Sequence, residues 1–593
     1  MDRDKQRLEG LENEITLSSL SSAWKDTVRH GLRNQDVYDL HDYLDIHKNI
    51  GSICKKIKSD VLSENYRTKE PLVISKEKGN GISRRVVVPS ARDSILMQTI
   101  VNGIEDKVID EEPTDSAYYS RSHAPPKSFR DVDETFPYAW WNLWPQYQKR
   151  IWKFTDEYKY LVVADVSKYF DSIPLDTLKT KLLSIGSFDE EKIDLLFFIL
   201  RDFVWQPEYV PYHGVGLPQI NFDAPRLLSH CYLFDIDEYI EEKNSGDFVR
   251  WMDDMNFGVE SIEKGKHMLK NIDLKLAGKG LRINSGKTKI LEPREAVKEL
   301  RINDNRYLNL IQNWQRQSLS DNRAKWLSYS KKFFDNFYDG ERYGRWEKVI
   351  KRFFTIFKDF DSEYLERVVP DVLIEHPGVR DSVFRYYRSI GYTTNRFEQI
   401  ATFVKSGHCV DDVSLFKSLH LISEWSIPYN SPYRKQSISL VDSLWNRYKS
   451  VPLVAGGLRV IGKYGNHQQL WDLVSKTKRT WRASEWGARQ IAGISPFLDS
   501  SLTSSIRKDL RSEGLLEGLR VLSHVGELKS WNSLDAQMKA YLTSDNKYYP
   551  LEKVILTYNH LRGSLGSQET ASLRREALSL CNDTVNEITI RNA

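Results

Sequence analysis

The sequence predicts an α+β fold in the first half of the chain and an all-helical second half. Before about residue 300, short runs typical of β-strands alternate with helical periods; these runs are Arg85–Pro89, Tyr160–Ala164, Val249–Met252 and the residues around Val259. After this point β-branched runs thin out and amphipathic helical periods dominate. The length of 593 residues predicts two to four domains.

The composition is that of a folded protein, with 40% hydrophobic and 28% charged residues. The 86 Lys and Arg residues nearly balance the 82 Asp and Glu residues, so any nucleic-acid site must be a local basic face. Four scattered cysteines form neither a disulfide framework nor a zinc pattern. We find no signal peptide and no apolar run of membrane-spanning length. We therefore expect a cytoplasmic protein without a membrane partner.

The first candidate site residue is Asp165, which ends the apolar run Tyr160–Ala164 and is followed by a helical turn with Tyr169 and Phe170. An unpaired carboxylate at the end of a buried strand is costly and needs an explanation. Taken alone, Asp165 is more simply explained as a helix N-cap.

A second acidic position is Asp253-Asp254, which lies between two apolar segments and predicts a β-hairpin with the acids at its tip. An Asp pair by itself is weak evidence. Asp411-Asp412 is a second such pair, and it precedes a helical run as an ordinary helix start. The first pair differs because another strand-end Asp precedes it.

Three carboxylates from two adjacent strands can hold two divalent ions a few ångströms apart. Their oxygen-only ligands suit Mg²⁺ or Mn²⁺. Such a pair serves the attack of a 3′-hydroxyl on a nucleotide. The residues alone leave this chemistry a hypothesis.

Ordered motifs flank the acids. Residues 214–219 form a flexible turn that leads into an amphipathic helix at residues 224–233. Residues 279–289 predict a helix end, a short strand and a basic turn, and residues 83–93 predict a basic strand and turn. The cations of these turns can bind triphosphate or template phosphates.

In this order the motifs resemble the palm and fingers of reverse transcriptases. DVSKYFD (165–171) is similar to motif A, GLPQ…PRLL (216–228) to motif B, WMDD (251–254) to motif C and GLRINSGKTK (280–289) to motif D. RRVVVPSARD (84–93) and SAYYSR (116–121) resemble the fingers motifs of prokaryotic members. The resemblance covers roughly residues 70–295. It implies an α+β polymerase palm and fingers, followed by an all-α helical-repeat C-terminal half.

The resemblance implies a role for each matching residue. Asp165, Asp253 and Asp254 are the expected catalytic metal ligands, and Phe170 matches the steric gate that selects dNTPs over NTPs. The other expected nucleotide-binding residues are Gln219, Arg85, Arg92 and Lys287, and the expected nucleic-acid contacts are Trp251, Arg226 and Lys289. Asp171 is read as structural. Each cation is equally compatible with a solvated surface position.

Two departures from the family pattern narrow the resemblance. Trp251-Met252 replaces the usual Tyr or Phe with Ala, and Ile220 follows Gln219 where the family has Gly, which puts ordinary templated copying in doubt. With the long helical half, these variants resemble the bacterial defence-associated reverse transcriptases (abortive-infection or "unknown group"). The resemblance implies Mg²⁺-dependent DNA synthesis in antiphage defence, with an unconventional template or a protein primer.

The expected partners are dNTPs, RNA or single-stranded DNA, and a noncoding RNA or neighbouring defence protein; a homo-oligomer is compatible with the sequence. One alternative is an RNA-templated reverse transcriptase of a mobile or diversity-generating retroelement. A second is a non-catalytic nucleic-acid-binding scaffold that keeps the palm fold. The expected parts are an N-terminal helical extension (1–68), fingers and palm (69–295), a thumb-like helical region (296–400) and a helical, HEAT-like C-terminal domain (401–593).

For several segments the sequence is compatible with two interpretations. Residues 140–150 combine Trp with basic side chains, which suits single-stranded nucleic acid or simply a seal against the core. Residues 331–354 suit a duplex-tracking face or an ordinary amphipathic helix. The C-terminal helices suit degenerate repeats or a simple accessory domain, with turns expected at Asp339-Gly340 and Gly456-Gly457. His123, His213 and His230 are isolated and expected to pack.

Overall fold

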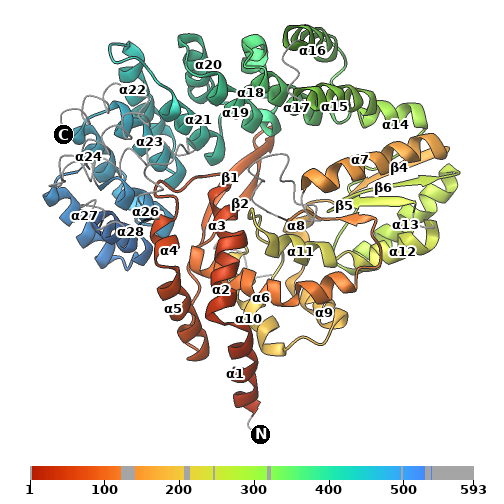
Figure 1. The fold of residues 1–593 in the computed structure, drawn as a ribbon, viewed down its shortest axis with the longest axis horizontal. Helices are drawn as coiled ribbons and strands as arrows, with labels where there is room; N and C mark the ends of the chain where they lie inside the picture. Colours follow the sequence, from red (N-terminus) through yellow and green to blue (C-terminus); the bar gives the residue numbers. More distant parts are fainter. Residues whose placement is uncertain are drawn as a thin grey trace.

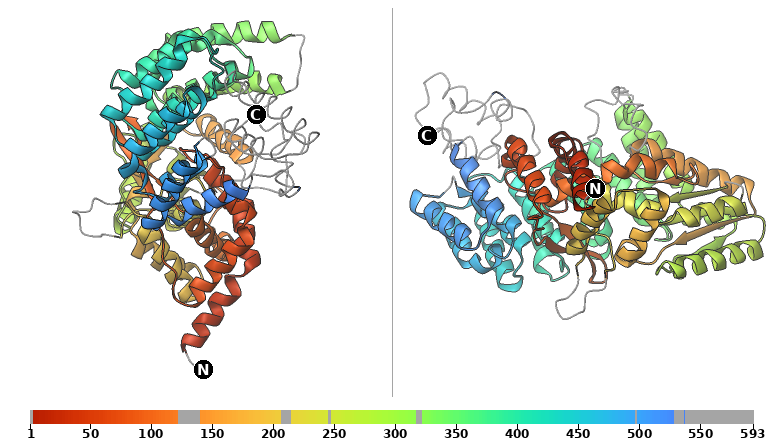
Figure 2. Two further views of the ribbon diagram at one scale, coloured as in Figure 1. Left: turned by 90° about the vertical axis from the view of Figure 1, so that its left-hand side faces the viewer. Right: turned by 90° about the horizontal axis from the view of Figure 1, so that it is seen from below.

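The computed structural model describes residues 3–121, 140–205, 214–244, 247–316, 322–495 and 498–527, together with residue 536. An α+β part built on a five-stranded sheet lies at one end of the molecule (Figure 1; Figure 2, right). Helices of the C-terminal half lie at the other end, and a two-stranded hairpin stands between the two. The expected division into an α+β half and a helical half is confirmed. His123 and His213 lie outside the described residues.

The five-stranded sheet has the order β3-β5-β6-β4-β7. Its strands are β3 (Ala117–Tyr118), β4 (Tyr160–Asp165), β5 (Phe248–Trp251), β6 (Asp254–Val259) and β7 (Lys289–Leu291). All neighbours are antiparallel except β3 and β5, which run parallel. The predicted strand runs in this region and the predicted hairpin, β5–β6, are therefore confirmed.

Both faces of the sheet are buried, which explains the near-continuous apolar run of β4. Leu161 packs toward helices α7 (Trp140–Glu157) and α14 (Pro293–Glu299), whereas Val162 and Ala164 belong to the core on the other face. Successive side chains of a strand point to opposite faces, so a strand covered on both sides needs apolar residues at every position. The second face is covered by α12 (Phe234–Asn244) and α13 (Ile262–Gly278).

Other helices of this half surround the sheet, and the helices that precede β1 form an N-terminal extension of the chain. They are α6 (Ala91–Asp110), α8 (Tyr169–Ser172), α9 (Leu175–Ile185), α10 (Glu190–Phe203) and α11 (Asp223–Cys231), and before them α1 (Arg3–Glu14), α2 (Leu17–Ser22), the π-helix η1 (Ala23–Val28), α3 (Arg29–Arg33), α4 (Leu44–Lys48) and α5 (Ile50–Leu62). The separate hairpin consists of β1 (Leu72–Gly79) and β2 (Ile82–Val88), which confirms the predicted basic strand.

After the sheet, every described element is helical. These elements are α15 (Ile302–Arg316), α16 (Arg323–Tyr338), α17 (Trp346–Asp359), η4 (Glu363–Val368), α18 (Val369–Glu375), η5 (Pro377–Val379), α19 (Arg380–Ile390), α20 (Thr394–Lys405), α21 (Asp412–Glu424), α22 (Pro432–Arg447), α23 (Val451–Tyr464), α24 (His467–Lys476), α25 (Lys478–Trp481), α26 (Glu485–Gly493), α27 (Ser500–Ser512) and α28 (Leu516–Glu527). Alternate helices stack in one row, α17 on α19, then α21, α23, α26 and α28.

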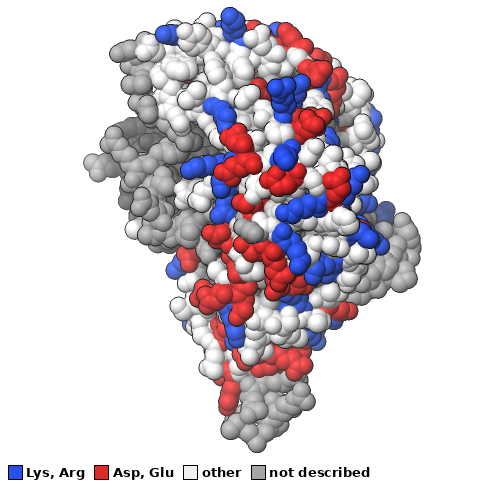
Figure 3. All heavy atoms as spheres, turned by 90° about the vertical axis from the view of Figure 1, so that its right-hand side faces the viewer, with Lys and Arg blue, Asp and Glu red and all other residues white. Residues whose placement is uncertain are grey.

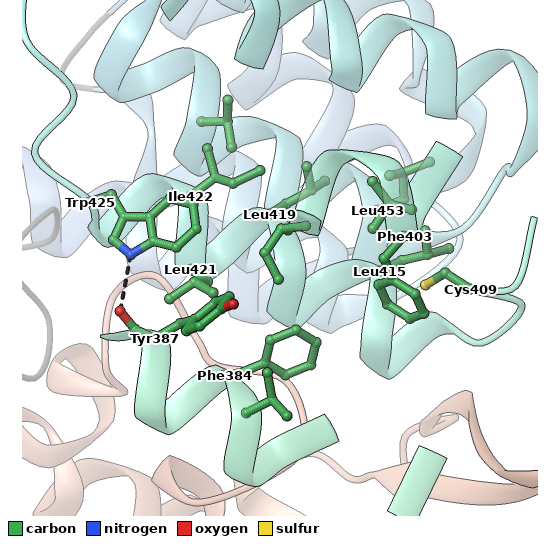
Figure 4. Close-up of a cluster of buried hydrophobic side chains, with 14 of the residues drawn as sticks. Phe384, Tyr387, Phe403, Cys409, Leu415, Leu419, Leu421, Ile422, Trp425 and Leu453 are labelled. Carbon is green, nitrogen blue, oxygen red and sulfur yellow. Dashed lines mark hydrogen bonds between the residues drawn. The ribbon is translucent and has the colours of Figure 1, made fainter. Parts of the chain in front are cut away.

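The row of helices encloses one continuous apolar core. In Figure 4 side chains of α19 and α21, such as Phe384, Leu415 and Leu419, point toward one another, and the Trp425 indole donates a hydrogen bond to the Tyr387 carbonyl at 3.2 Å. The aromatic pairs of residues 331–354 also enter this core, because Phe334, Phe353 and Phe354 are fully buried. The amphipathic-helix interpretation of that segment therefore holds in the structure.

One predicted turn is wrong. Gly456 and Gly457 lie inside α23 and do not interrupt it. A Cβ at Gly456 would stand 2.9 Å from the Leu419 Cβ, and one at Gly457 would stand 2.7 Å from the Val441 Cγ1. The glycines therefore let three helices approach closely. The turn after α16, at Asp339-Gly340, is confirmed.

The helical half holds the β1–β2 hairpin by buried polar contacts. Asp411 caps α21, as predicted for the second Asp pair, by accepting from the Ser414 backbone. Its neighbour Asp412 accepts from both the backbone and the hydroxyl of Ser75 in β1. Arg380 lies between Asp411 and Glu77 of β1, at 3.1 and 2.7 Å. No helix within the described ranges is long and apolar enough to cross a lipid bilayer.

Candidate active site

Asp165 and Asp254 face each other across neighbouring strands of the sheet, and Asp253 lies in the turn beside them. The register pairs Asp165 at the end of β4 with Asp254 at the start of β6. The β5–β6 turn is made by Met252, whose φ of 54° is left-handed, and by Asp253. The antiparallel pairing therefore places the three acids at the same end of the strand pair β4–β6.

A buried arginine holds this turn. Arg250 in β5 is 0% exposed; its Nε donates to Asp237 at 2.6 Å and its Nη1 donates to the Met252 carbonyl at 2.7 Å. A positive φ in a residue with a side chain is strained and persists only where its surroundings enforce it. The ion pair with Asp237 fixes Arg250, and Arg250 thereby fixes the backbone that presents Asp253.

The three carboxylates have different electrostatic surroundings. Burial, together with the charges of Asp254 and Asp165, raises the pKa of Asp253 to about 6. Burial also acts on Asp254, but Lys348 and Arg345 hold its pKa below the usual value. Asp165 accepts from Lys287 Nζ at 3.2 Å and from Asn284 Nδ2 at 3.1 Å. Asp253 is therefore the acid whose negative charge is least compensated.

A large cavity opens in front of Asp165 and Asp253. Its volume is about 950 Å³, and six predicted site residues line it: Asp165, Asp253, Phe170, Gln219, Arg85 and Lys287. The fold thus brings together residues that lie up to about 200 positions apart in the sequence. Within this cavity Arg85 stacks its guanidinium on the Trp205 ring, 4.7 Å from the ring centroid.

Gln219 ties the loop before α11 to the hairpin and to α8. Its backbone carbonyl accepts from the amide of Val87, and its side chain donates to Asp171 at 2.8 Å. Asp171 thus has a structural partner, which agrees with the reading of this acid. Leu217 N donates to the Phe170 carbonyl at 2.7 Å, so the loop also fixes the backbone that carries the Phe170 ring.

Four other predicted site residues do not line this cavity, although the register places Trp251 directly opposite Asp254. Arg92 on α6 pairs with Asp60 at 2.7 Å, and Lys289 pairs with Glu299 at 2.9 Å. Trp251 packs among aromatic rings of β3 and α7, including Trp144 at a centroid distance of 5.3 Å. Arg226 lines a second, neighbouring cavity.

The same aromatic cluster supports the packing interpretation of residues 140–150 for Trp144, whereas Trp140 is 58% exposed. Trp144 stacks on Tyr147, which is 0% exposed, so these rings seal α7 against the sheet. His230 is likewise buried, with its Nε2 3.0 Å from Glu112. Both findings agree with packing roles.

Sequence reasoning included Lys348 in the segment 331–354 but did not connect it with the acids of the site. Lys348 of α17 lies 3.4 Å from Asp254, and burial together with Arg345 lowers the pKa of Lys348 to about 8. In the sequence Lys348 is only a basic residue within an amphipathic helical period, a pattern that is common to many helices. Arg84, which also lines the cavity, sat within a quoted motif but was not singled out.

Asp165, Asp253 and Asp254 are the candidate ligands for a divalent ion. Among the described residues no group of three or more His, Cys, Asp and Glu side chains is arranged as a ready metal site. However, Asp165 and Asp253 both line the cavity, and burial together with the charges of Asp254 and Asp165 raises the pKa of Asp253. Mg²⁺ is usually held by one or two carboxylates plus substrate phosphates. The donor set therefore fits Mg²⁺ or Mn²⁺ that arrives with a nucleotide.

Residues 75–329 match the family model described as "Reverse transcriptase (RNA-dependent DNA polymerase)". This segment is a reverse-transcriptase domain. It contains the palm sheet and all three acids, and a largely helical region follows it. The match covers less than half of the chain.

Two further comparisons add little. A solved structure described as "Structure of apo telomerase from Candida Tropicalis" is 10% identical and aligns over 75% of this chain and 74% of its own, with a TM-score of 0.29. We draw no conclusion from so low a score. No curated protein matches the chain.

The surface at the palm end of the molecule carries both positively and negatively charged side chains. In Figure 3, which faces the palm end, Lys and Arg are interspersed with Asp and Glu. This agrees with the net charge of +4. The cations that line the 950 Å³ cavity, Lys78, Arg84, Arg85, Lys168 and Lys287, are a local set.

Proposed function

We propose that this chain is a metal-dependent DNA polymerase whose active site is the 950 Å³ cavity at Asp165 and Asp253. The observation that carries the proposal is the joint placement of the strand-end Asp165, the turn residue Asp253, the Phe170 ring and Lys287 around one cavity inside a reverse-transcriptase domain. The divalent ions would be held by Asp165, Asp253 and Asp254, and they supply activation of a 3′-hydroxyl and charge stabilisation of the leaving pyrophosphate.

The protein's own residues bind and orient the nucleotide. Lys287 and Arg85 meet the triphosphate, with Arg84 beside them as a third cation of the cavity wall. Phe170 occupies the space next to the sugar, where an aromatic ring excludes a 2′-hydroxyl. Gln219, held by Asp171 and β2, supports the base side of the cavity. Arg92, Trp251 and Lys289 would then serve the site indirectly, through packing and ion pairs.

The first test is nucleotide incorporation by the purified protein with Mg²⁺, each dNTP and NTP separately, with and without added template. Asp253→Asn/Asp254→Asn should abolish incorporation, because it removes two charges that the metal requires. Asp176→Asn is the matched control, since Asp176 is an 85%-exposed acid of α9 that pairs only weakly with Arg201. Equal incorporation by wild type and the double variant would overturn the proposal.

The same assay separates the roles that we propose from their alternatives. We propose a role in bacterial antiphage defence with an unconventional template or a protein primer; Ile220 after Gln219, Trp251-Met252 and the long helical half support it. Acid-dependent DNA made without added template, and shifted by protease, is the expected result. DNA made only on added RNA would favour a mobile or diversity-generating element. Full function in the absence of any incorporation would favour a scaffold.

The remaining proposals concern organisation and partners. We divide the chain into a helical extension (1–68), fingers and palm (69–295), a thumb-like region (296–400) and a C-terminal domain (401–593), whose alternate stacking of helices supports a repeat-like arrangement. RNA or single-stranded DNA, a noncoding RNA, a neighbouring defence protein and a second copy of the chain are the proposed partners. The cytoplasm is the proposed location.

A further inference from the structure

A second cavity adjoins the nucleotide cavity and is closed by the N-terminal segment of the chain. Its volume is about 400 Å³, within the range of small-molecule sites. Arg84, Phe170 and Gln219 line both cavities, so the two meet at the Phe170 ring. The other wall is formed by residues 34–36, which precede the segment matched by the reverse-transcriptase family.

Gln35 is the unusual residue of this wall. Its side chain lines the cavity, the residue is 3% exposed, and its Nε2 has no hydrogen-bond partner. Arg84 lines the same cavity, and its Nε is also buried without a partner. A buried donor without a partner costs about 1–3 kcal/mol, so two at one cavity indicate a ligand with acceptor atoms.

Gln35 is held in place from both sides. The carbonyl of Asn34 accepts from the Asn221 amide at 2.8 Å. Asp36 accepts from Lys76 at 2.6 Å and from Lys417 of α21 at 3.2 Å. Because its two neighbours are fixed to the palm, the hairpin and the helical half, the Gln35 amide is preorganised and cannot move far to find another partner.

The cavity wall favours a nucleobase over a phosphate group. Its polar part consists of four amide side chains, Asn34, Gln35, Gln219 and Asn221, and four charged side chains, Asp36, Lys76, Arg84 and Arg226. Val86, Ile220 and Phe170 supply apolar surface. Two of its three cations are engaged by other side chains, Lys76 by Asp36 and Asp381 and Arg226 by the Asn221 side chain. The third, Arg84, donates to the Gln219 side chain at 3.4 Å. Amides read the edges of bases, and aromatic or apolar side chains pack on their faces.

We propose that this second cavity binds a nucleobase and that Gln35 donates a hydrogen bond to an acceptor on the edge of that base. The proposal rests on the polymerase function proposed above and makes the N-terminal segment a determinant of base selection. The base belongs either to the incoming dNTP or to a template nucleotide opposite it, since both would lie beyond the Phe170 ring. A carbonyl oxygen, as on thymine or guanine, is the acceptor that a Gln amide donor favours.

The test compares Gln35→Leu, which removes the donor, with Gln35→Glu, which replaces it by an acceptor. Relative kcat/KM is measured for the four dNTPs without template and then on four homopolymer templates, with Gln468→Leu on the exposed face of α24 as control. Gln35→Leu should reduce the preference for carbonyl-bearing bases by about 3- to 10-fold. Gln35→Glu should shift it toward bases that carry an amino group.

The two sources of the base give different results. A change that follows the dNTP identifies the incoming base, and a change that follows the homopolymer identifies the template base. Active Gln35 variants with all ratios within twofold of wild type would overturn the inference. A gain of preference for amino-bearing bases in Gln35→Glu that is absent from Gln35→Leu could not arise from misfolding.

Failure of the polymerase proposal is recognised separately. If the wild type incorporates nothing, equilibrium binding of each dNTP is measured with Ca²⁺ in place of Mg²⁺. Binding that depends on Gln35 would uphold the nucleobase cavity without the polymerase. Binding that is absent, or unchanged in both Gln35 variants, would overturn it.

Discussion

Replacement of Arg489 by Met should strongly destabilise the junction between the N-terminal segment and the helical half. The guanidinium of Arg489 in α26 is 1% exposed and donates to Asp39 at 2.8 Å and to Asp45 at 2.8 and 3.1 Å, both 0% exposed. Removal of Arg489 leaves two buried carboxylates without their main counter-charge. Breaking a buried pair in this way costs about 3–5 kcal/mol.

That cost corresponds to a fall in Tm of about 6–20 °C for a unit of 150–250 residues. Because a chain of several domains need not unfold in one step, the local readout is hydrogen exchange of residues 36–48, whose protection should fall. The loss should shrink near pH 5, since protonation relieves buried, unpaired carboxylates. Lys508→Met, at an exposed position of α27, is the control. Unchanged protection with a Tm within about 2 °C of wild type would refute the reasoning.

Three further outcomes are expected. Gly457→Val should lower stability by about 1–3 kcal/mol, because its side chain would overlap Val441, whereas Gly51→Ala in open space should raise Tm slightly; equal effects would contradict the close-packing argument. Burial raises the pKa of Glu517 to about 7, so the stability that the protonated side chain contributes is lost as pH rises through 7. The Tm of Glu517→Gln should therefore rise relative to the Tm of wild type between pH 5 and pH 8. A Tm difference that stays constant over this range would contradict the argument. Phe170→Ala should raise NTP relative to dNTP incorporation by about tenfold or more, measured as a ratio of kcat/KM, and an unchanged ratio would remove Phe170 from sugar selection.

The sequence was informative where a local pattern has a single structural outcome. The run Tyr160–Ala164 predicted a buried strand, and Asp253-Asp254 between apolar segments predicted a hairpin tip. Asp411-Asp412 was correctly separated from them, because a helical period followed it directly. In each case the signal lay within a few residues of the element that it described.

Contacts between distant segments could not be predicted in this way. Arg489 and Asp39 are 450 positions apart, and neither stands in a recognisable motif. Gly456-Gly457 has the composition of a turn, and only the positions of Leu419 and Val441 explain why it is helical. Lys348 reaches Asp254 because the start of α17 lies beside α7, with its Nζ 5.7 Å from the centroid of the Trp144 ring, a placement that its amphipathic period does not contain.

The N-terminal segment 34–45 connects the two halves of the molecule at the site. On one side Gln35 lines the cavity beside Phe170. On the other, Asp36 accepts from Lys417, the Leu40 amide donates to Gln490 at 2.9 Å, and Asp39 pairs with Arg489. The helical half therefore fixes the segment that carries Gln35. Arg489→Met should loosen this segment. It should therefore lower the hydrogen-exchange protection of residues 36–48 and weaken base selection, even though Arg489 itself lines neither cavity.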